Sequence, residues 1–267
     1  MEYRIIHADS GTALPDIPAG TVDLVVTSPP YRRRDGYSED MIIAVFRELQ
    51  RVLRPDSLCF VVFGHLAENK SAPYELHNLV RGVGFRLRDT ICWKKNHFAP
   101  VQGSRNLNNL WEFVLGFQSQ QEPPQTRTVF AFIQMFSKGR PRLDRLSVGV
   151  PYADPSNAAR FNRGQNLRCA GNFWEIPHAT IQRREERTHP HEFPLELPAR
   201  CIRLSGIAPG STVLDPFMGG GTTLEAALCL GMNAIGIDRS GPCCRAAERR
   251  LRSFMKERMI AVRRNLN

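Results

Sequence analysis

Apolar residues follow two alternating patterns along this chain. Short, nearly continuous apolar runs predict buried strands, whereas segments with an apolar residue every three or four positions predict helices. The first pattern predicts strands at 3–8, 22–27, 58–63, 85–93, 111–117, 211–214 and 233–237. The second predicts helices at 38–53, 74–83, 195–204, 222–230 and 242–259. Strands that alternate with helices are typical of an α/β fold, in which a mostly parallel sheet carries helices on both faces.

The stretch from Gln118 to Arg187 lacks both patterns. It is rich in proline, asparagine, glycine and arginine, and its apolar positions have no clear period. We therefore expect a loop-rich insert within one α/β domain, for which 267 residues suffice. The expected division is 1–117 for the first half of the domain, 118–187 for the insert and 188–267 for the second half.

The chain is strongly basic, with 36 lysines and arginines against 26 acidic residues and a net charge of +10. The charge is uneven, because residues 118–187 carry 11 basic and 6 acidic residues and residues 239–267 carry 9 and 2. Basic patches of this kind favour a polyanionic partner such as nucleic acid. For the last predicted helix a solvated face is the alternative, and we expect it for Arg245, Arg249, Arg250, Arg252 and Arg258.

Neither the cysteines nor the histidines suggest a metal site. The seven cysteines form no C-x-x-C pair, and most lie among apolar residues, as buried thiols do. His189 and His191 have no third ligand beside them. No apolar run approaches about 20 residues and the N-terminus resembles no secretory signal, so we expect a cytoplasmic protein.

A glycine-rich segment, Asp215-Pro216-Phe217-Met218-Gly219-Gly220-Gly221-Thr222, joins a predicted strand to a predicted helix. Glycines let the backbone turn sharply and approach a ligand, and the following helix N-terminus favours polar or anionic groups. Asp238 ends the next strand, where an acid can accept hydrogen bonds from a ribose diol. This order predicts a site for an adenosine-containing cofactor, with a tight turn that binds nothing as the alternative. The dinucleotide pattern G-x-G-x-x-G is absent, because Leu224 holds its third position.

A second unusual segment, Ser28-Pro29-Pro30-Tyr31, follows the predicted strand at 22–27. Consecutive prolines fix the backbone and remove two N–H donors, so the carbonyls beside them act only as acceptors. The tyrosine adds a flat face for stacking. Acceptors beside a stacking plane suit a ring with an exocyclic amine, whose nitrogen becomes more nucleophilic when both N–H bonds are drawn to acceptors. In isolation, Pro-Pro-Tyr is also compatible with a rigid surface turn.

Together the two segments resemble those of the amino-group DNA methyltransferases that use S-adenosylmethionine. The order is that of the permuted group, in which the catalytic motif precedes the cofactor motif. Residues 189–198 resemble the family's cofactor-lining helix, 91–96 and 110–115 its hairpin region, and Asp9 an acid near the cofactor adenine. The resemblance covers 1–117 and 188–251.

The resemblance implies a Rossmann-like sheet of seven strands, one of them antiparallel, and a target recognition region at 118–187. It implies double-stranded DNA as the substrate, flipping of the target base, and a role in restriction-modification or epigenetic marking. Ser28 before the two prolines favours cytosine N4 within this family. Methylation of adenine N6 or of an amine in RNA, and a nucleic-acid-binding protein without turnover, are the alternatives. The permuted group is also compatible with a two-fold dimer and with a partner restriction endonuclease.

The resemblance also implies a role for individual residues. The catalytic residues are expected to be Ser28, Pro29, Pro30 and Tyr31. Cofactor binding is expected at Asp9, His189, Pro194, Asp215, Pro216, Phe217, Gly219, Gly221, Thr222 and Asp238. From their charge and position, DNA contacts are expected at Arg32, Arg33, Arg34, Arg140, Arg142, Arg145, Arg160, Arg163 and Arg168, with most of them to phosphate. A solvated loop is an equal alternative for Arg32, Arg33 and Arg34.

Overall fold

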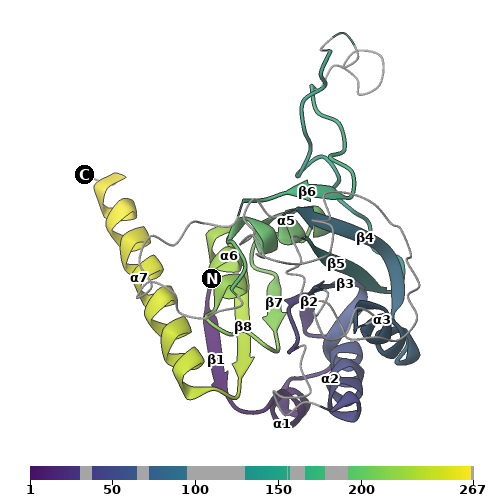
Figure 1. Cartoon of the computed structure of the whole chain (residues 1–267). Coiled ribbons are helices and arrows are strands. Elements are labelled where there is room, and N and C mark those ends of the chain that lie inside the picture. Colours follow the sequence, from purple (N-terminus) through teal and green to yellow (C-terminus); the bar gives the residue numbers. More distant parts are fainter. Residues whose placement is uncertain are drawn as a thin grey trace, which may run out of the picture.

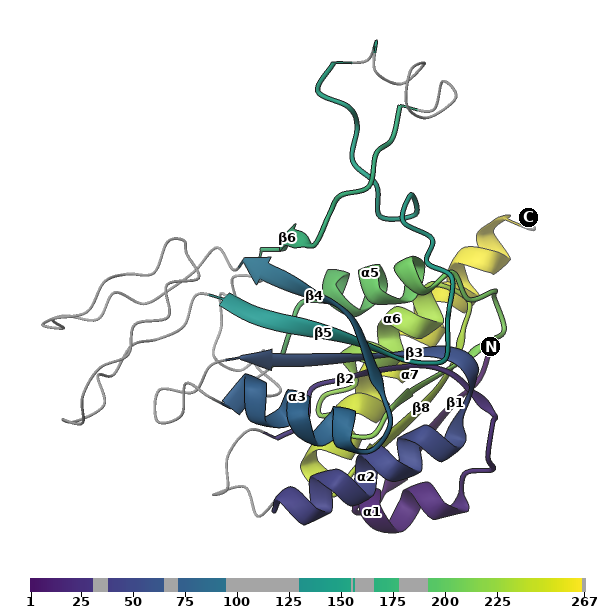
Figure 2. The same ribbon diagram turned by 90° about the vertical axis from the view of Figure 1, so that its right-hand side faces the viewer.

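The computed structural model describes residues 1–30, 38–64, 72–94, 130–154, 156, 166–177 and 192–265. These residues form one eight-stranded sheet with helices on both faces (Figures 1 and 2). The strands are β1 (Tyr3–His7), β2 (Val22–Thr27), β3 (Leu53–Gly64), β4 (Arg86–Lys94), β5 (Phe130–Lys138), β6 (Phe173–Glu175), β7 (Thr212–Asp215) and β8 (Asn233–Asp238). The helices are α1 (Ser10–Ala13), the 3-10 helix η1 (Leu14–Asp16), α2 (Glu39–Val52), α3 (Ala72–Gly82), α5 (Glu196–Ser205), α6 (Thr222–Cys229) and α7 (Gly241–Asn265).

The strand order is β1-β8-β7-β2-β3-β5-β4-β6. Only β5 among them runs antiparallel, and it pairs with β3 on one side and with β4 on the other. The predicted mostly parallel α/β sheet with one antiparallel strand is therefore confirmed. The described residues hold eight strands, one more than the expected seven. Six of the eight match strands predicted from periodicity, whereas β5 and the three-residue edge strand β6 beside β4 were not predicted. Three residues are too few to give a periodic signal in the sequence.

The expectation of a loop-rich segment over 118–187 was wrong for β5. This nine-residue strand lies inside the sheet, and its sequence is apolar on both faces. Ile133 and Met135 pack into the core on one face of the sheet, and Phe136 packs into the core on the other. The prolines and arginines around β5 dominate the composition of the region and hide this apolar run. The strand expected at 111–117 lies outside the described residues.

After β5 the chain crosses the end of α5, where Asp144 N donates to Leu204 O over 2.9 Å. It then leaves the body of the protein as an extended arm (Figures 1 and 2). Val150 and Arg168 close the root of the arm with two reciprocal backbone hydrogen bonds of 2.9 and 2.8 Å. The arm therefore begins and ends at one β-bridge.

Each face of the sheet covers its own hydrophobic core. Side chains alternate between the faces along a strand, so Leu24 and Val26 point to one core and Val25 to the other. Helices α5, α6 and α7 cover the first core, and α1, α2 and α3 cover the second (Figure 2). Because both faces of β2 are buried, its sequence is a nearly continuous apolar run.

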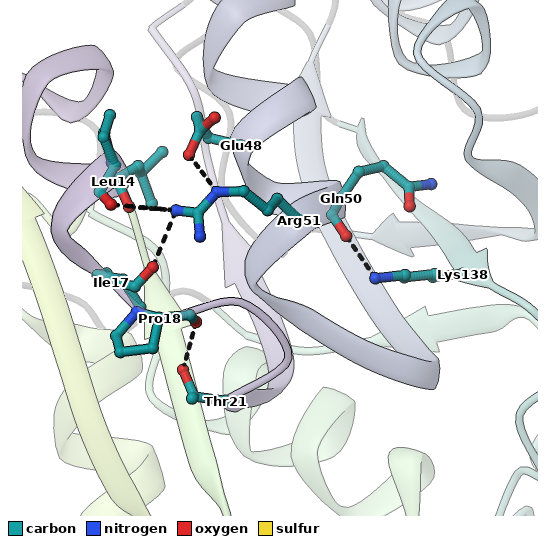
Figure 3. A network of polar contacts seen from close by, with 9 residues as sticks. Leu14, Ile17, Pro18, Thr21, Glu48, Gln50, Arg51 and Lys138 are labelled. Carbon is teal, nitrogen blue, oxygen red and sulfur yellow. Dashed lines mark hydrogen bonds and ion pairs between the residues drawn. The ribbon is translucent and has the colours of Figure 1, made fainter.

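The carboxyl end of α2 is tied to η1 by its own Arg51 and to β5 by Lys138, as Figure 3 shows. Arg51 donates to Leu14 O over 2.9 Å and to Ile17 O over 2.8 Å, and its Nε contacts Glu48. Lys138 at the end of β5 donates to Gln50 O and Leu53 O over 2.6 and 2.7 Å. The carbonyl of Gln50 near the end of the helix and the carbonyls before β2 are thus satisfied by side-chain donors, in addition to the backbone cap that Leu53 N makes to Leu49 O.

Replacing Arg51 with methionine should lower the free energy of unfolding by about 1–3 kcal/mol, because the carbonyls of η1 lose their donor. Chemical denaturation measures this change. Arg47→Met on the same helix is the control, since Arg47 is exposed, and it should change the free energy by less than about 0.5 kcal/mol. Equal losses in the two variants would contradict the proposed role of Arg51.

Candidate active site

The carboxyl ends of β1, β8, β7 and β2 lie at one edge of the sheet, because these four neighbouring strands are parallel. After β7 the chain continues through α6 to β8, whereas after β2 it continues through α2 to β3, in the opposite direction along the sheet (Figure 1). Such a topological switch point is where open α/β sheets bind ligands. Ser28-Pro29-Pro30 and the glycine segment after Asp215 emerge on its two sides.

A buried hydrogen bond joins the two sides of the switch point. Thr27 Oγ1 donates to Asp215 Oδ1 over 2.7 Å, and the two residues are 0% and 1% exposed. Phe217 N donates to the same carboxylate oxygen over 3.0 Å. One oxygen atom therefore receives a bond from the residue before Ser28 and another from the start of the glycine segment.

Burial raises the pKa of the Asp215 carboxyl to about 6, and the negative charge of Asp238 adds to the rise. The hydrogen bonds from Thr27 and Phe217 oppose the rise in pKa, because they stabilise the carboxylate. At neutral pH the carboxylate form predominates and can accept both bonds.

The glycine segment turns tightly above β7 and β8. Met218 N donates to Ile237 O over 3.0 Å, and Gly221 N donates to Met218 O over 2.9 Å. Gly219 and Gly221 have φ angles of 51° and 83°, in the left-handed region that favours glycine. Nothing lies within 4 Å of the position that a Cβ on Gly219 would occupy, so the turn is open on that side.

Asp238 holds this turn from the end of β8. Its Oδ2 accepts from Gly219 N over 2.9 Å, and its Oδ1 accepts from Ser240 N over 2.7 Å. A carboxylate offers about four lone-pair positions, so each oxygen can accept a further hydrogen bond. The side chain is therefore fixed by the backbone and still able to bind a diol.

Asp9 and Ser10 reach the same edge from β1. Ala8 N donates to Asp238 O over 3.1 Å, which keeps the residues after β1 beside the end of β8. Asp9 caps α1 by accepting from Gly11 N over 2.9 Å, and Ser10 Oγ donates to Pro216 O. Periodicity predicted no helix here, because α1 is only four residues long.

Helix α7 packs directly against the glycine turn. A Cβ on Gly221 would lie 2.8 Å from the Cβ of Ala247, so only glycine fits at this crossing. The expected role of Arg250 in a solvated face was wrong, because it lies on the packed side of α7. Its guanidinium donates to Gly220 O over 3.0 Å and to Thr222 Oγ1 over 2.7 Å.

Two carboxylates neutralise Arg250. It forms ion pairs with Glu192, which precedes α5, and with Glu225 on α6, the latter over 3.4 Å. Thr222 Oγ1 also donates to Glu192 over 2.9 Å. The first turn of α6 is thus tied to α7 and to the segment before α5. The sequence gives no local signal for this cluster, since its members come from three separate segments.

The other predicted site residues are placed as follows. Pro194 lies two residues before the start of α5, where its carbonyl accepts from Leu197 N over 3.0 Å. Four predicted DNA-contacting arginines are exposed, three on the segment that crosses the end of α5 and one at the root of the arm: Arg140, Arg142, Arg145 and Arg168. Seven predicted site residues lie outside the described residues: Tyr31, Arg32, Arg33, Arg34, Arg160, Arg163 and His189.

Within the described ranges, no three histidine, cysteine, aspartate or glutamate side chains gather closely enough to hold a metal ion. In the same part of the chain, no helix combines the length and apolar character needed to cross a membrane.

Residues 22–249 match the family described as DNA methylase, and the chain belongs to this family of DNA methyltransferases. Among its relatives is the Type II methyltransferase M.MjaI of Methanocaldococcus jannaschii, 27% identical over 291 residues, with 89% of this chain and 88% of the relative covered. Another is the DNA adenine methyltransferase YhdJ of Escherichia coli K12, 27% identical over 261 residues, with 92% and 82% covered.

Solved structures are similar over nearly the whole chain. TTHA0409 of Thermus thermophilus, described as a DNA modification methylase, superposes with a TM-score of 0.61 at 25% identity and 93% coverage of both chains. A form of it complexed with S-adenosyl-L-methionine gives 0.60 at 24% identity, with 94% of both chains covered. The cytosine-N4-specific PvuII DNA methyltransferase gives 0.66 at 19% identity, covering 93% of this chain and 86% of that one, a likeness of fold.

Gly221→Ala should destabilise the protein more than Gly210→Ala does. Both glycines have left-handed φ angles, 83° and 87°, but only at Gly221 does the new Cβ meet a neighbour. Backbone strain should lower the free energy of unfolding of both variants by about 1–2 kcal/mol. Overpacking against Ala247 should lower that of Gly221→Ala by about 1–3 kcal/mol more. Thermal unfolding measures the difference, and equal melting temperatures would show that α7 does not constrain the turn.

The buried carboxyl of Asp215 should make stability fall as the pH rises from about 4 to about 6. Its pKa is about 6 in the folded state against an ordinary 3.8, so the folded protein holds this proton more tightly than the unfolded chain. That stabilisation is complete below the unfolded pKa and lost above the folded one, and amounts to at most about 3 kcal/mol.

Asp215→Asn lacks this titration and keeps an acceptor oxygen. Urea unfolding measures the free energy of unfolding of both proteins between pH 4 and pH 7. The value for the variant should therefore rise relative to that of the wild type as the pH rises. A difference that stays constant across this range would mean that burial does not raise the pKa of Asp215.

Proposed function

We propose that this DNA methyltransferase transfers the methyl group of S-adenosylmethionine to N4 of a cytosine flipped out of double-stranded DNA. The observation that carries the proposal is the meeting of Ser28-Pro29-Pro30 and the glycine turn on the two sides of one switch point, joined by the bond between Thr27 and Asp215. A target base inside the duplex cannot reach such a site, so it must leave the stack.

The residues at the edge of β7 and β8 fit S-adenosylmethionine. Asp238 has free lone pairs for the ribose diol, the turn from Phe217 to Gly221 is open at Gly219, and the N-terminus of α6 offers backbone donors. Asp9 follows β1, the strand beside β8, and we assign it to the part of the site that holds the adenine of the cofactor. When bound, the cofactor supplies an electrophilic methyl group on a sulfonium centre.

The catalytic segment acts by orientation and by hydrogen bonding. Ser28 Oγ and the carbonyl of Pro29 accept from the exocyclic amine, which localises the lone pair on nitrogen, and Tyr31 stacks on the base. Pro30 keeps the segment rigid. No covalent intermediate with the enzyme is required, so catalysis depends on positioning and on preorganised acceptors.

The exposed arginines between β5 and β6 are the proposed DNA contacts. Arg140, Arg142, Arg145 and Arg168 add positive charge where the chain leaves the sheet. Since β5 belongs to the sheet, we place the target recognition region at 139–172. Contacts to phosphate there would make binding fall steeply with salt concentration.

The preference for cytosine rests on Ser28, and adenine N6 is the second candidate because the relative YhdJ is an adenine methyltransferase. Incubation with labelled cofactor and DNA of random sequence, followed by digestion to nucleosides, separates the two. We expect label in N4-methylcytosine. Label in N6-methyladenine would establish the second candidate, label only with RNA would reassign the substrate, and no label would refute turnover.

Ser28→Ala should bind S-adenosylmethionine as the wild type does and lose methyl transfer by on the order of 100-fold, because an acceptor aimed at the reacting amine is removed. Single-turnover transfer and calorimetric binding measure the two effects. Ser253→Ala is the control, since Ser253 is exposed on α7, and it should leave both unchanged. Full activity in Ser28→Ala would exclude the proposed catalytic segment.

A further inference from the structure

We propose that Thr27 is a positioning residue for methyl transfer. Its hydroxyl and the carboxylate of Asp215 set the distance between the catalytic segment and the glycine turn. This inference rests on the proposed catalytic role of Ser28, the next residue along the chain. Neither Thr27 nor its bond to Asp215 follows from the local patterns of the sequence.

The first support comes from where strand pairing ends. The last backbone pair between β2 and β7 is Val25 with Leu214. Beyond it, Thr27 is still paired with Val61 on β3 and Asp215 with Gly236 on β8, but β2 and β7 are no longer paired with each other. The bond between Thr27 Oγ1 and Asp215 Oδ1 crosses the place where the strands separate.

The second support is that Asp215 Oδ1 also accepts from Phe217 N. The atom that fixes Thr27 therefore also fixes the first part of the glycine turn. Both Thr27 and Asp215 are excluded from solvent, so water does not compete for these bonds. Hydrogen bonds are stronger in such low-dielectric surroundings.

The third support is the steep dependence of catalysis on position. The amine acceptors stand on one side of the switch point and the cofactor turn stands on the other, so any change in their separation alters the approach of nitrogen to the methyl carbon. A displacement of about 1 Å in an active site can cost about 100-fold in rate. The described residues proposed to bind the cofactor all lie on one side of this separation, so cofactor binding should depend on it less than the transfer step does.

Thr27→Val tests the inference because valine keeps the branched shape that suits a strand and replaces the hydroxyl with a methyl group that cannot donate a hydrogen bond. We expect kcat at saturating cofactor and DNA to fall by about 10- to 100-fold. The Kd for S-adenosylmethionine should change by less than about threefold, a change of less than about 0.7 kcal/mol. Thr27→Ser restores the hydroxyl and should recover most of kcat.

Thr21→Val is the matched control at the opposite end of β2. Thr21 Oγ1 donates to Pro18 O over 2.8 Å, so this variant also loses one threonine hydrogen bond, but away from the switch point (Figure 3). It should keep the kcat of the wild type. If Thr27→Val does not fold, Thr27→Ala makes the same comparison, because a smaller side chain introduces no clash.

Two outcomes would overturn the inference. In one, the valine variant has a lower melting temperature and yet an unchanged kcat, measured where both proteins are folded. In the other, Thr21→Val loses kcat as much as Thr27→Val does. These outcomes differ from a failure of the proposed function, in which the wild type transfers no methyl group or Ser28→Ala is fully active.

Discussion

The pairing of β2 with β7 is the constraint on which the rest of the molecule depends. It brings Thr27 beside Asp215 although 188 positions separate them in the chain. Closing so long a loop costs conformational entropy, and the two hydrophobic cores on either side of the sheet offset this cost. The chemistry assigned to the two segments is available only when both cores are complete, so folding and function are linked through one strand pair.

Around this strand pair, polar groups at the carboxyl edge of the sheet form hydrogen bonds with one another. Ser10 reaches the carbonyl of Pro216, Asp238 fixes Gly219, and Arg250 fixes Gly220 from α7. Each bond joins residues from different elements, so the shape of the turn does not depend on its own sequence alone. A site built in this way is preorganised before any ligand arrives, and less free energy is lost to ordering on binding.

Periodicity predicted most of the regular elements, because both faces of the sheet are buried and the helices are amphipathic. It failed for β5, whose apolar run lies inside a segment dominated by proline and arginine. It also failed for α1 and β6, which have four and three residues and are too short for an apolar pattern to repeat. The residues near the switch point were found when they belonged to a contiguous motif, as Asp215 and Gly219 did. Thr27 and Arg250 were missed because their partners lie far away in the chain.

The single bridge between Val150 and Arg168 at the root of the arm has a consequence for how this protein can change over time. Cα atoms in a hydrogen-bonded antiparallel pair are about 5.5 Å apart, so whatever chain lies between them begins and ends at nearly one point. Residues can be inserted or deleted there without moving a strand of the sheet. Under the proposed assignment of target recognition to this part of the chain, exchange of the arm alone would change the sequence preference and leave the residues proposed for methyl transfer in place.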